Sequence, residues 1–114
     1  MLPSLIHGFG LSTIRIDQIV RLEASRNYTY IFFKNGTKLL TANTMAHYEA
    51  TFPAYFIRVH RSHYININEI KTLGNQVVLN DGKRIPVSRR KRRQTIEAVV
   101  NLSISNEISI TNEY

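Results

Sequence analysis

The sequence predicts a mainly β fold of small antiparallel sheets with two short helices, and three observations support this prediction. Segments rich in aromatic and β-branched residues, such as Tyr28–Lys34, recur along the chain. The pairs Asn35-Gly36 and Asp81-Gly82 stand between segments of this kind, and such pairs are strong signals of a tight hairpin. Only two stretches place apolar residues at helical spacing.

The first half of the chain is expected to form two hairpins. Gly8-Phe9-Gly10 turns the first hairpin, which pairs residues 5–6 with Thr13–Ile16. The Asn-Gly pair turns the second hairpin and joins Tyr28–Lys34 to Thr37–Ala42.

A further strand is expected at Ile19–Ala24, between the two hairpins. Polarity alternates along this segment, so one face of the strand is apolar and the other is charged. The apolar face carries Val20, Leu22 and Ala24, and the charged face carries Arg21 and Glu23.

A short helix is expected to follow, with Asn43 or Thr44 as its N-cap and Pro53 as its stop. Three apolar residues share one of its faces: Met45, Tyr48 and Phe52. The chain then returns to strands, which are expected at Phe56–His60, Tyr64–Ile67, Ile70–Leu73, Gln76–Asn80 and Lys83–Val87. The last strand contains Pro86, which cannot donate a ladder hydrogen bond, so it is predicted to lie at a sheet edge.

Ser88 is a suitable N-cap for a second helix, which is expected to run from Arg89 to about Asn101. This helix would be seated on a sheet by Ile96, Val99 and Val100. Residues 1–101 are predicted to form one domain, because 114 residues are too few for two. Residues 102–114 form a C-terminal tail, which is either disordered or paired as a weak final strand.

Positive charge is concentrated at the start of the second helix. The chain has 15 Lys and Arg against 8 Asp and Glu, a net charge of +7, and seven of the 15 lie within residues 83–93. Ser88 is followed by Arg-Arg-Lys-Arg-Arg, although a helix N-terminus already carries partial positive charge. A charge run is usually a solvated helix face, but this end of a helix is also a natural phosphate seat. The clustering favours an anionic partner, and a nucleic-acid backbone is the obvious candidate.

A second candidate site lies in the segment Phe56–Asn66, where apolar and polar residues alternate until a polar kink. Arg61 and His63 are expected at an exposed loop tip, within reach of a partner. Ser62 and Asn66 are more simply explained as turn residues that satisfy backbone groups.

The polar loop Arg26–Thr29 is a third candidate, since Asn and Thr at a loop edge can bond to bases, to phosphates or within their own turn. Three blocks thus occur in order: Leu22–Thr29, Phe56–Asn66 and Ile85–Arg90. Together they resemble the LytTR (LytR/AlgR-type) DNA-binding domain of bacterial response regulators. The F-x-R-x-H-R-S-x-x-x-N pattern of the middle block carries most of this resemblance.

The resemblance implies an elongated assembly of small antiparallel sheets whose loops, rather than a recognition helix, enter successive major grooves of double-stranded DNA. It implies base contacts at Thr29, Arg61 and Arg90. It implies phosphate contacts at Asn27, Tyr28, Ser62, Arg89, Lys91 and Arg93. It further implies two copies on paired short repeats, with a weak dimer on DNA. The family usually carries a receiver domain, a membrane segment or another input module, for which residues 1–13 leave no room. The chain is therefore expected to be either a fragment of a longer regulator or a stand-alone binding module.

Catalysis, a cofactor and a metal centre are not expected. The chain has no Cys, and its Asp and Glu residues are scattered singly. His60-x-x-His63 lacks further ligands at a convincing spacing.

No apolar run approaches the roughly 18 residues that span a bilayer, and residues 1–10 do not read as a signal peptide. A cytoplasmic location is therefore expected.

The predicted function is sequence-specific binding of double-stranded DNA in transcriptional regulation. An RNA-binding module is one alternative, because Tyr28, Tyr30 and Phe32 could offer a stacking face. A module that binds proteins or anionic membrane surfaces through its basic residues is the other.

Overall fold

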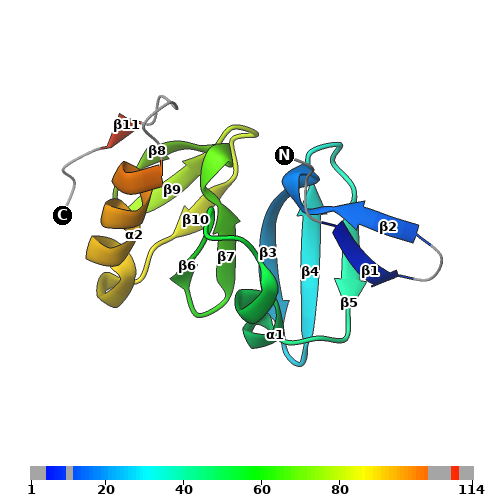
Figure 1. Cartoon of the computed structure of the whole chain (residues 1–114). Helices are drawn as coiled ribbons and strands as arrows, with labels where there is room; N and C mark the ends of the chain where they lie inside the picture. Colours follow the sequence, from blue (N-terminus) through cyan, green and yellow to red (C-terminus); the bar gives the residue numbers. More distant parts are fainter. Residues whose placement is uncertain (1–4, 10–11, 103–108, 111–114) are drawn as a thin grey trace.

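The computed structural model describes residues 5–9, 12–102 and 109–110, and it is mainly β, as the sequence predicts (Figure 1). Its strands are β1 (Leu5–Phe9), β2 (Ser12–Arg15), β3 (Ile19–Ser25), β4 (Tyr28–Phe33), β5 (Lys38–Thr41), β6 (Phe56–His60), β7 (His63–Asn66), β8 (Ile70–Leu73), β9 (Gln76–Leu79), β10 (Arg84–Pro86) and β11 (Ser109–Ile110). Its helices are α1 (Met45–Thr51) and α2 (Arg89–Leu102). The principal extents are 45 × 34 × 24 Å, so the molecule is elongated.

The strands form three sheets. β1 and β2 make a hairpin in which Leu5 pairs with Arg15. Gly8 and Phe9 lie in β1 and not in a turn as predicted, and the third residue of that prediction, Gly10, lies outside the described residues. The largest sheet is antiparallel and has the order β5-β4-β3-β7-β6. The third sheet has the order β10-β9-β8-β11, in which β11 runs parallel to β8. β10, which contains Pro86, lies at a sheet edge, as predicted.

The predicted glycine turns are confirmed. Gly36 joins β4 to β5 with a φ of +88°, and Gly82 joins β9 to β10 with a φ of +89°. A side chain with a Cβ rarely adopts this backbone region, which explains why glycine ends both turns. Gly74-Asn75 makes the turn between β8 and β9.

β3 departs from the simple alternation that the sequence predicts. A register shift just before Arg21 marks a bulge, so Val20 and Leu22 pack into different cores instead of sharing one face. Arg21 is buried, because β3 lies in the middle of its sheet. Its guanidinium lies 3.6 Å from the centre of the Phe32 ring and donates to Glu23 at 2.8 Å.

Two hydrophobic cores hold the molecule together. One core lies between α1 and the five-stranded sheet and contains Ile16, Ile19, Leu22, Ile31, Met45, Tyr48, Phe56 and Tyr64. The other core joins α2 to the four-stranded sheet and contains Val20, Val59, Ile65, Ile67, Ile70, Leu73, Val77, Leu79, Ile85, Val87 and Val99. β6 and β7 contribute side chains to both cores, so the turn between these two strands is fixed relative to both halves of the molecule.

α1 forms as predicted. Met45 and Tyr48 are buried in the first core, and the helix ends before Pro53. Phe52 is half-buried, and its ring centre lies 5.0 Å from that of Phe56. Thr44 occupies the N-cap position, but its side chain makes no capping hydrogen bond.

α2 also forms as predicted, but the prediction of its buried face is wrong at one position. Val99 is fully buried and Ile96 packs beside it, but Val100 is 52% exposed because it lies about 100° around the helix from Val99. Thr95 takes the expected place of Val100 on the buried face, where its hydroxyl donates to a carbonyl one turn earlier at 2.7 Å. No helix in the described part of the chain is long and apolar enough to cross a bilayer.

Candidate nucleic-acid interface

Three segments that are far apart in the sequence lie along one edge of the molecule. They are the turn between β3 and β4, the turn between β6 and β7, and the first residues of α2. Figure 1 shows all three at the lower edge, coloured light blue, green and yellow in turn. We define the basic edge as residues 26–28, 61–62 and 89–93.

Backbone hydrogen bonds fix the order of these segments. The Ala24 N–H donates to the Ser62 carbonyl at 2.9 Å and thereby joins the end of β3 to the β6–β7 turn. The Ser88 N–H donates to the Val59 carbonyl at 2.9 Å and joins the start of α2 to β6. The β6–β7 turn therefore lies in the middle of the basic edge, with one segment on each side.

A cavity of about 420 Å³ lies between the β6–β7 turn and α2. Its lining is mostly cationic and consists of Glu49, Arg58, His60, Arg61, Ser88, Arg90 and Lys91. Glu49, the one carboxylate in this lining, forms an ion pair with Arg58. The remaining charged groups that face the cavity are positive, which favours an anion.

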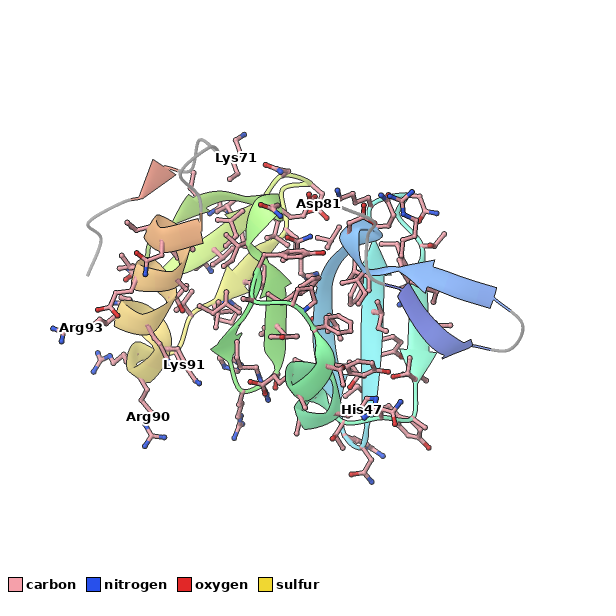
Figure 2. The ribbon with its side chains drawn as sticks, in the orientation of Figure 1. His47, Lys71, Asp81, Arg90, Lys91 and Arg93 are labelled. Atoms are coloured by element: carbon pink, nitrogen blue, oxygen red, sulfur yellow. The ribbon has the colours of Figure 1, made fainter. Side chains whose placement is uncertain are left out.

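The cations of α2 diverge from one another. Arg89, Arg90 and Arg93 are exposed, and Lys91 is half-buried. Figure 2 shows Arg90 projecting beyond the lower end of α2, Lys91 directed toward β6, and Arg93 directed away from the fold. The first turn of α2 contains no acidic residue. Within the described residues, no ion pair is formed by these four side chains or by Arg61.

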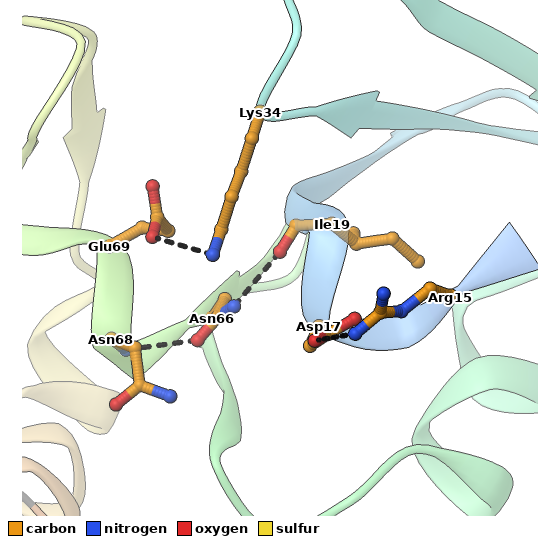
Figure 3. Close-up of polar contacts among 7 residues, drawn as sticks. All are labelled: Arg15, Asp17, Ile19, Lys34, Asn66, Asn68 and Glu69. Atoms are coloured by element: carbon orange, nitrogen blue, oxygen red, sulfur yellow. Dashed lines mark hydrogen bonds and ion pairs between the residues drawn. The ribbon is translucent and has the colours of Figure 1, made fainter. Parts of the chain in front are cut away.

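The β6–β7 turn presents Arg61 to solvent, as predicted. Ser62 serves the turn through its backbone: its N–H donates to Nδ1 of His60 at 3.1 Å. The explanation of Asn66 as a structural residue is confirmed. Its buried amide donates to the Ile19 carbonyl at 2.9 Å and accepts from the Asn68 N–H at 2.9 Å (Figure 3).

His63 does not lie at an exposed loop tip, so that prediction is wrong. It begins β7, and its side chain is only 14% exposed. Its Nδ1 lies 3.6 Å from Glu23, which is too long for a hydrogen bond. Burial lowers the pKa of His63; Glu23 opposes this effect, and the neighbouring cations Arg21 and Lys83, together with His60, add to it.

His60 and His63 do lie together, with ring centres 5.2 Å apart. Among the residues that the structure describes, no group of three His, Cys, Asp or Glu side chains is placed to hold a metal ion. The Nδ1 atom of His60 is already engaged as an acceptor in the turn. The two rings are therefore part of the turn's packing.

The β3–β4 turn exposes Asn27 and Tyr28 but not Thr29. Arg26 opens this turn with a φ of +58°, and Tyr28 is 49% exposed. Thr29 is fully buried, and its hydroxyl donates to the Asn43 carbonyl at 2.7 Å. Neighbouring residues of a strand point to opposite faces, so Thr29 faces the core when Tyr28 faces out. The expected base contact at Thr29 does not fit this position.

Arg58 and Glu49 were not singled out by the sequence analysis, yet both border the basic edge. Arg58 looks like an ordinary polar position in an alternating strand. In the structure it pairs with Tyr64 across the β6–β7 ladder and reaches both α1 and the turn. The pKa of Tyr64 is raised to about 12, chiefly by burial, with Glu49 adding to this effect and Arg58 opposing it. This corner is therefore poorly hydrated.

Comparisons with known proteins show the family of this chain and a similar fold. The family model of the LytTr DNA-binding domain matches residues 10–99. Among solved structures, the chain is similar to the LytTr DNA-binding domain of a protein described as a methyl-accepting/DNA response regulator from Bacillus cereus, with a TM-score of 0.69 and 20% sequence identity. That similarity covers 88% of this chain and 97% of the other. The comparison with curated proteins gives no match.

Proposed function

Because this chain belongs to the LytTr DNA-binding domain family, we propose that its basic edge binds double-stranded DNA in a sequence-specific manner and regulates transcription. One observation carries the proposal: three distant segments of the chain meet at a single edge, and a cationic cavity lies between two of them. Within the described residues, Arg61, Arg89, Arg90, Lys91 and Arg93 form no ion pair. A duplex laid along this edge would meet all three segments at once. We expect the two turns and the α2 terminus to enter neighbouring grooves.

The residues of the basic edge divide into two groups. Arg61 and Arg90 are the proposed base readers, because both are exposed and a guanidinium can bond to O6 and N7 of guanine together. The proposed phosphate contacts are Asn27, Tyr28, Ser62, Arg89, Lys91 and Arg93. Thr29 and His63 are left out of the interface, because one is buried and the other is nearly so.

Two copies of the domain on paired short repeats remain part of the proposal. The similar protein from Bacillus cereus is described as a response regulator, and a regulator of this kind would gain specificity from a second copy. A single domain contacts few base pairs, so two adjacent sites multiply the discrimination.

The alternative of RNA binding by base stacking is less favoured. Tyr30 and Phe32 lie on the face of β4 opposite Ile31, as a stacking platform requires. Both rings are already covered: Arg21 lies 3.6 Å from the Phe32 ring centre and Lys38 lies 5.0 Å from that of Tyr30. Competition between duplex DNA and single-stranded RNA separates the two functions. Binding to anionic vesicles without any duplex binding would instead favour the membrane alternative.

The division of labour predicts different effects for two arginine substitutions. Arg61→Ala should relax the base preference at one position of the site, at a cost of about 1–3 kcal/mol in discrimination. Arg93→Ala should weaken binding to every duplex alike and reduce the salt dependence by about one phosphate contact. Titration of both variants with a selected duplex and a random duplex provides the measurement. Identical behaviour of the two variants on both duplexes would contradict the assignment.

A further inference from the structure

We propose that Arg58 is a positioning residue that holds Arg61 in its DNA-reading conformation and so sets base preference without contacting DNA. This inference rests on the proposed function, because it needs Arg61 to read a base. It concerns a residue on the inner side of the basic edge, between α1 and the β6–β7 turn.

The guanidinium of Arg58 makes three contacts in three directions. Its Nε donates to the His60 carbonyl at 3.0 Å. One terminal nitrogen donates to the carbonyl of Arg61 itself. The other terminal nitrogen forms an ion pair with Glu49 on α1. One side chain thus binds the carbonyls of the last residue of β6 and the first residue of the turn, and it anchors both to a helix.

Two groups hold the peptide unit between Arg61 and Ser62. Its N–H, which belongs to Ser62, donates to Nδ1 of His60. Its carbonyl accepts no other hydrogen bond among those of the described residues. The contact from Arg58 is made to the carbonyl of Arg61 itself. That contact limits rotation of the peptide unit that follows Arg61 and thereby limits where its side chain can point.

Burial gives these contacts their strength. The side chain of Arg58 is 19% exposed, compared with 38% for Glu49. Hydrogen bonds from an ionised donor in a poorly hydrated place are stronger than neutral ones, and they depend on geometry. Arg58 has a planar fork with five N–H donors, whereas a lysine offers one small ammonium that cannot reach three acceptors in these directions.

Arg58 also lines the cationic cavity, so a direct phosphate contact is the competing role. The two roles predict different results for Arg58→Lys. A phosphate contact depends on charge, which lysine keeps. Positioning depends on the fork, which lysine lacks.

The test measures affinity for a selected duplex and for a random duplex at several salt concentrations. Arg58→Lys is expected to lower the ratio of the two affinities by about tenfold, within the range of a lost bidentate base contact, with an unchanged salt slope. In an Arg61→Ala background the same substitution should lower the ratio no further, because the two residues act through one contact. Arg15→Lys is the matched control, since its ion pair with Asp17 at 3.0 Å lies outside the basic edge.

A second variant guards against loss of folding in Arg58→Lys. Glu49→Gln changes an exposed residue of α1 and removes the ion pair while leaving the carbonyl contacts in place. It should lower the ratio in the same direction, by about two- to fivefold. Thermal unfolding of each variant shows whether the loss of specificity occurs in folded protein.

Three results would overturn the inference. Unchanged ratios in both variants would show that the turn holds Arg61 without Arg58. A shallower salt slope, with equal losses on both duplexes, would assign Arg58 to a phosphate. If Arg61→Ala alone leaves the ratio unchanged, the proposed base reading by Arg61 fails first and Arg58 has nothing to position.

Discussion

At the residue scale, Thr29 shows how burial decides between two roles that the same side chain could perform. Its hydroxyl is chemically suited to a base edge or to a turn. In the structure it is fully buried and donates to the Asn43 carbonyl just before α1. It therefore ties the start of β4 to the segment that leads into the helix. The exposed side chain of this turn is that of Tyr28, one position earlier.

Thr29→Val tests this structural role. The substitution keeps the shape of the side chain but leaves the Asn43 carbonyl without its buried partner, so the free energy of unfolding should fall by about 1–3 kcal/mol. Base preference should stay the same. Chemical denaturation and duplex titration measure the two quantities. Thr37→Val, at an exposed hydrogen bond to Asn35, is the control and should change stability much less. A variant with normal stability but altered base preference would restore Thr29 to the interface.

His63 predicts a pH dependence of stability. Burial lowers the pKa of His63 in the folded state, whereas the unfolded chain has a value near 6.5. As the pH falls below about 6.5, the unfolded state takes up this proton before the folded state does, so the stability that neutral His63 provides is present above that pH and lost through the lowered folded pKa. The melting temperature of His63→Gln should therefore decline less between pH 7 and pH 5 than that of the wild type. His47→Gln, on the exposed side of α1, should follow the wild type.

At the element scale, local sequence signals predict the strands, both helices and the glycine turns, because each of these depends on a few neighbouring residues. Hairpins around Gly36 and Gly82 need a positive φ, which glycine adopts without strain. Details that depend on packing are not accessible in this way. Because of the bulge before Arg21, Val20 packs into a different core from Leu22. No local sequence pattern predicts which of the two cores will cover each face of β3.

The same limit explains which parts of the site could be predicted. The cations of α2 and Arg61 stand out by residue type and by resemblance, and the structure brings them to one edge. The sequence contains a signal for the burial of Thr29. Ile31 lies two positions further along the strand, so the two side chains share a face, and Ile31 is an apolar residue that is expected in the core. The role of Arg58 depends on Glu49 in α1, which the chain places beside it only through folding.

At the scale of the whole molecule, charge is distributed unevenly between two ends. The basic edge holds Arg61, Arg89, Arg90, Lys91 and Arg93, which form no ion pair within the described residues. Figure 2 shows Lys71 and Asp81 at the opposite, upper side of the molecule. Lys34 and Glu69 form an ion pair at 3.7 Å near that end (Figure 3). A net charge of +7 with this asymmetry should orient the domain toward a polyanion before contact and raise the association rate at low salt.

The electrostatic contribution of the basic edge can be measured through the salt dependence of DNA binding. If the basic edge neutralises about six phosphates, the released counterions should make affinity fall by about three decades between 50 and 200 mM monovalent salt. Lys71→Ala, which removes a cation at the opposite end, should keep the same slope, whereas Arg89→Ala should make it shallower by about 0.9. Equal slopes for these two variants would mean that DNA does not lie along the basic edge. A wild-type affinity that does not change across this range would mean that phosphate contacts contribute little to binding. The cations of α2 would then form only a hydrated helix face.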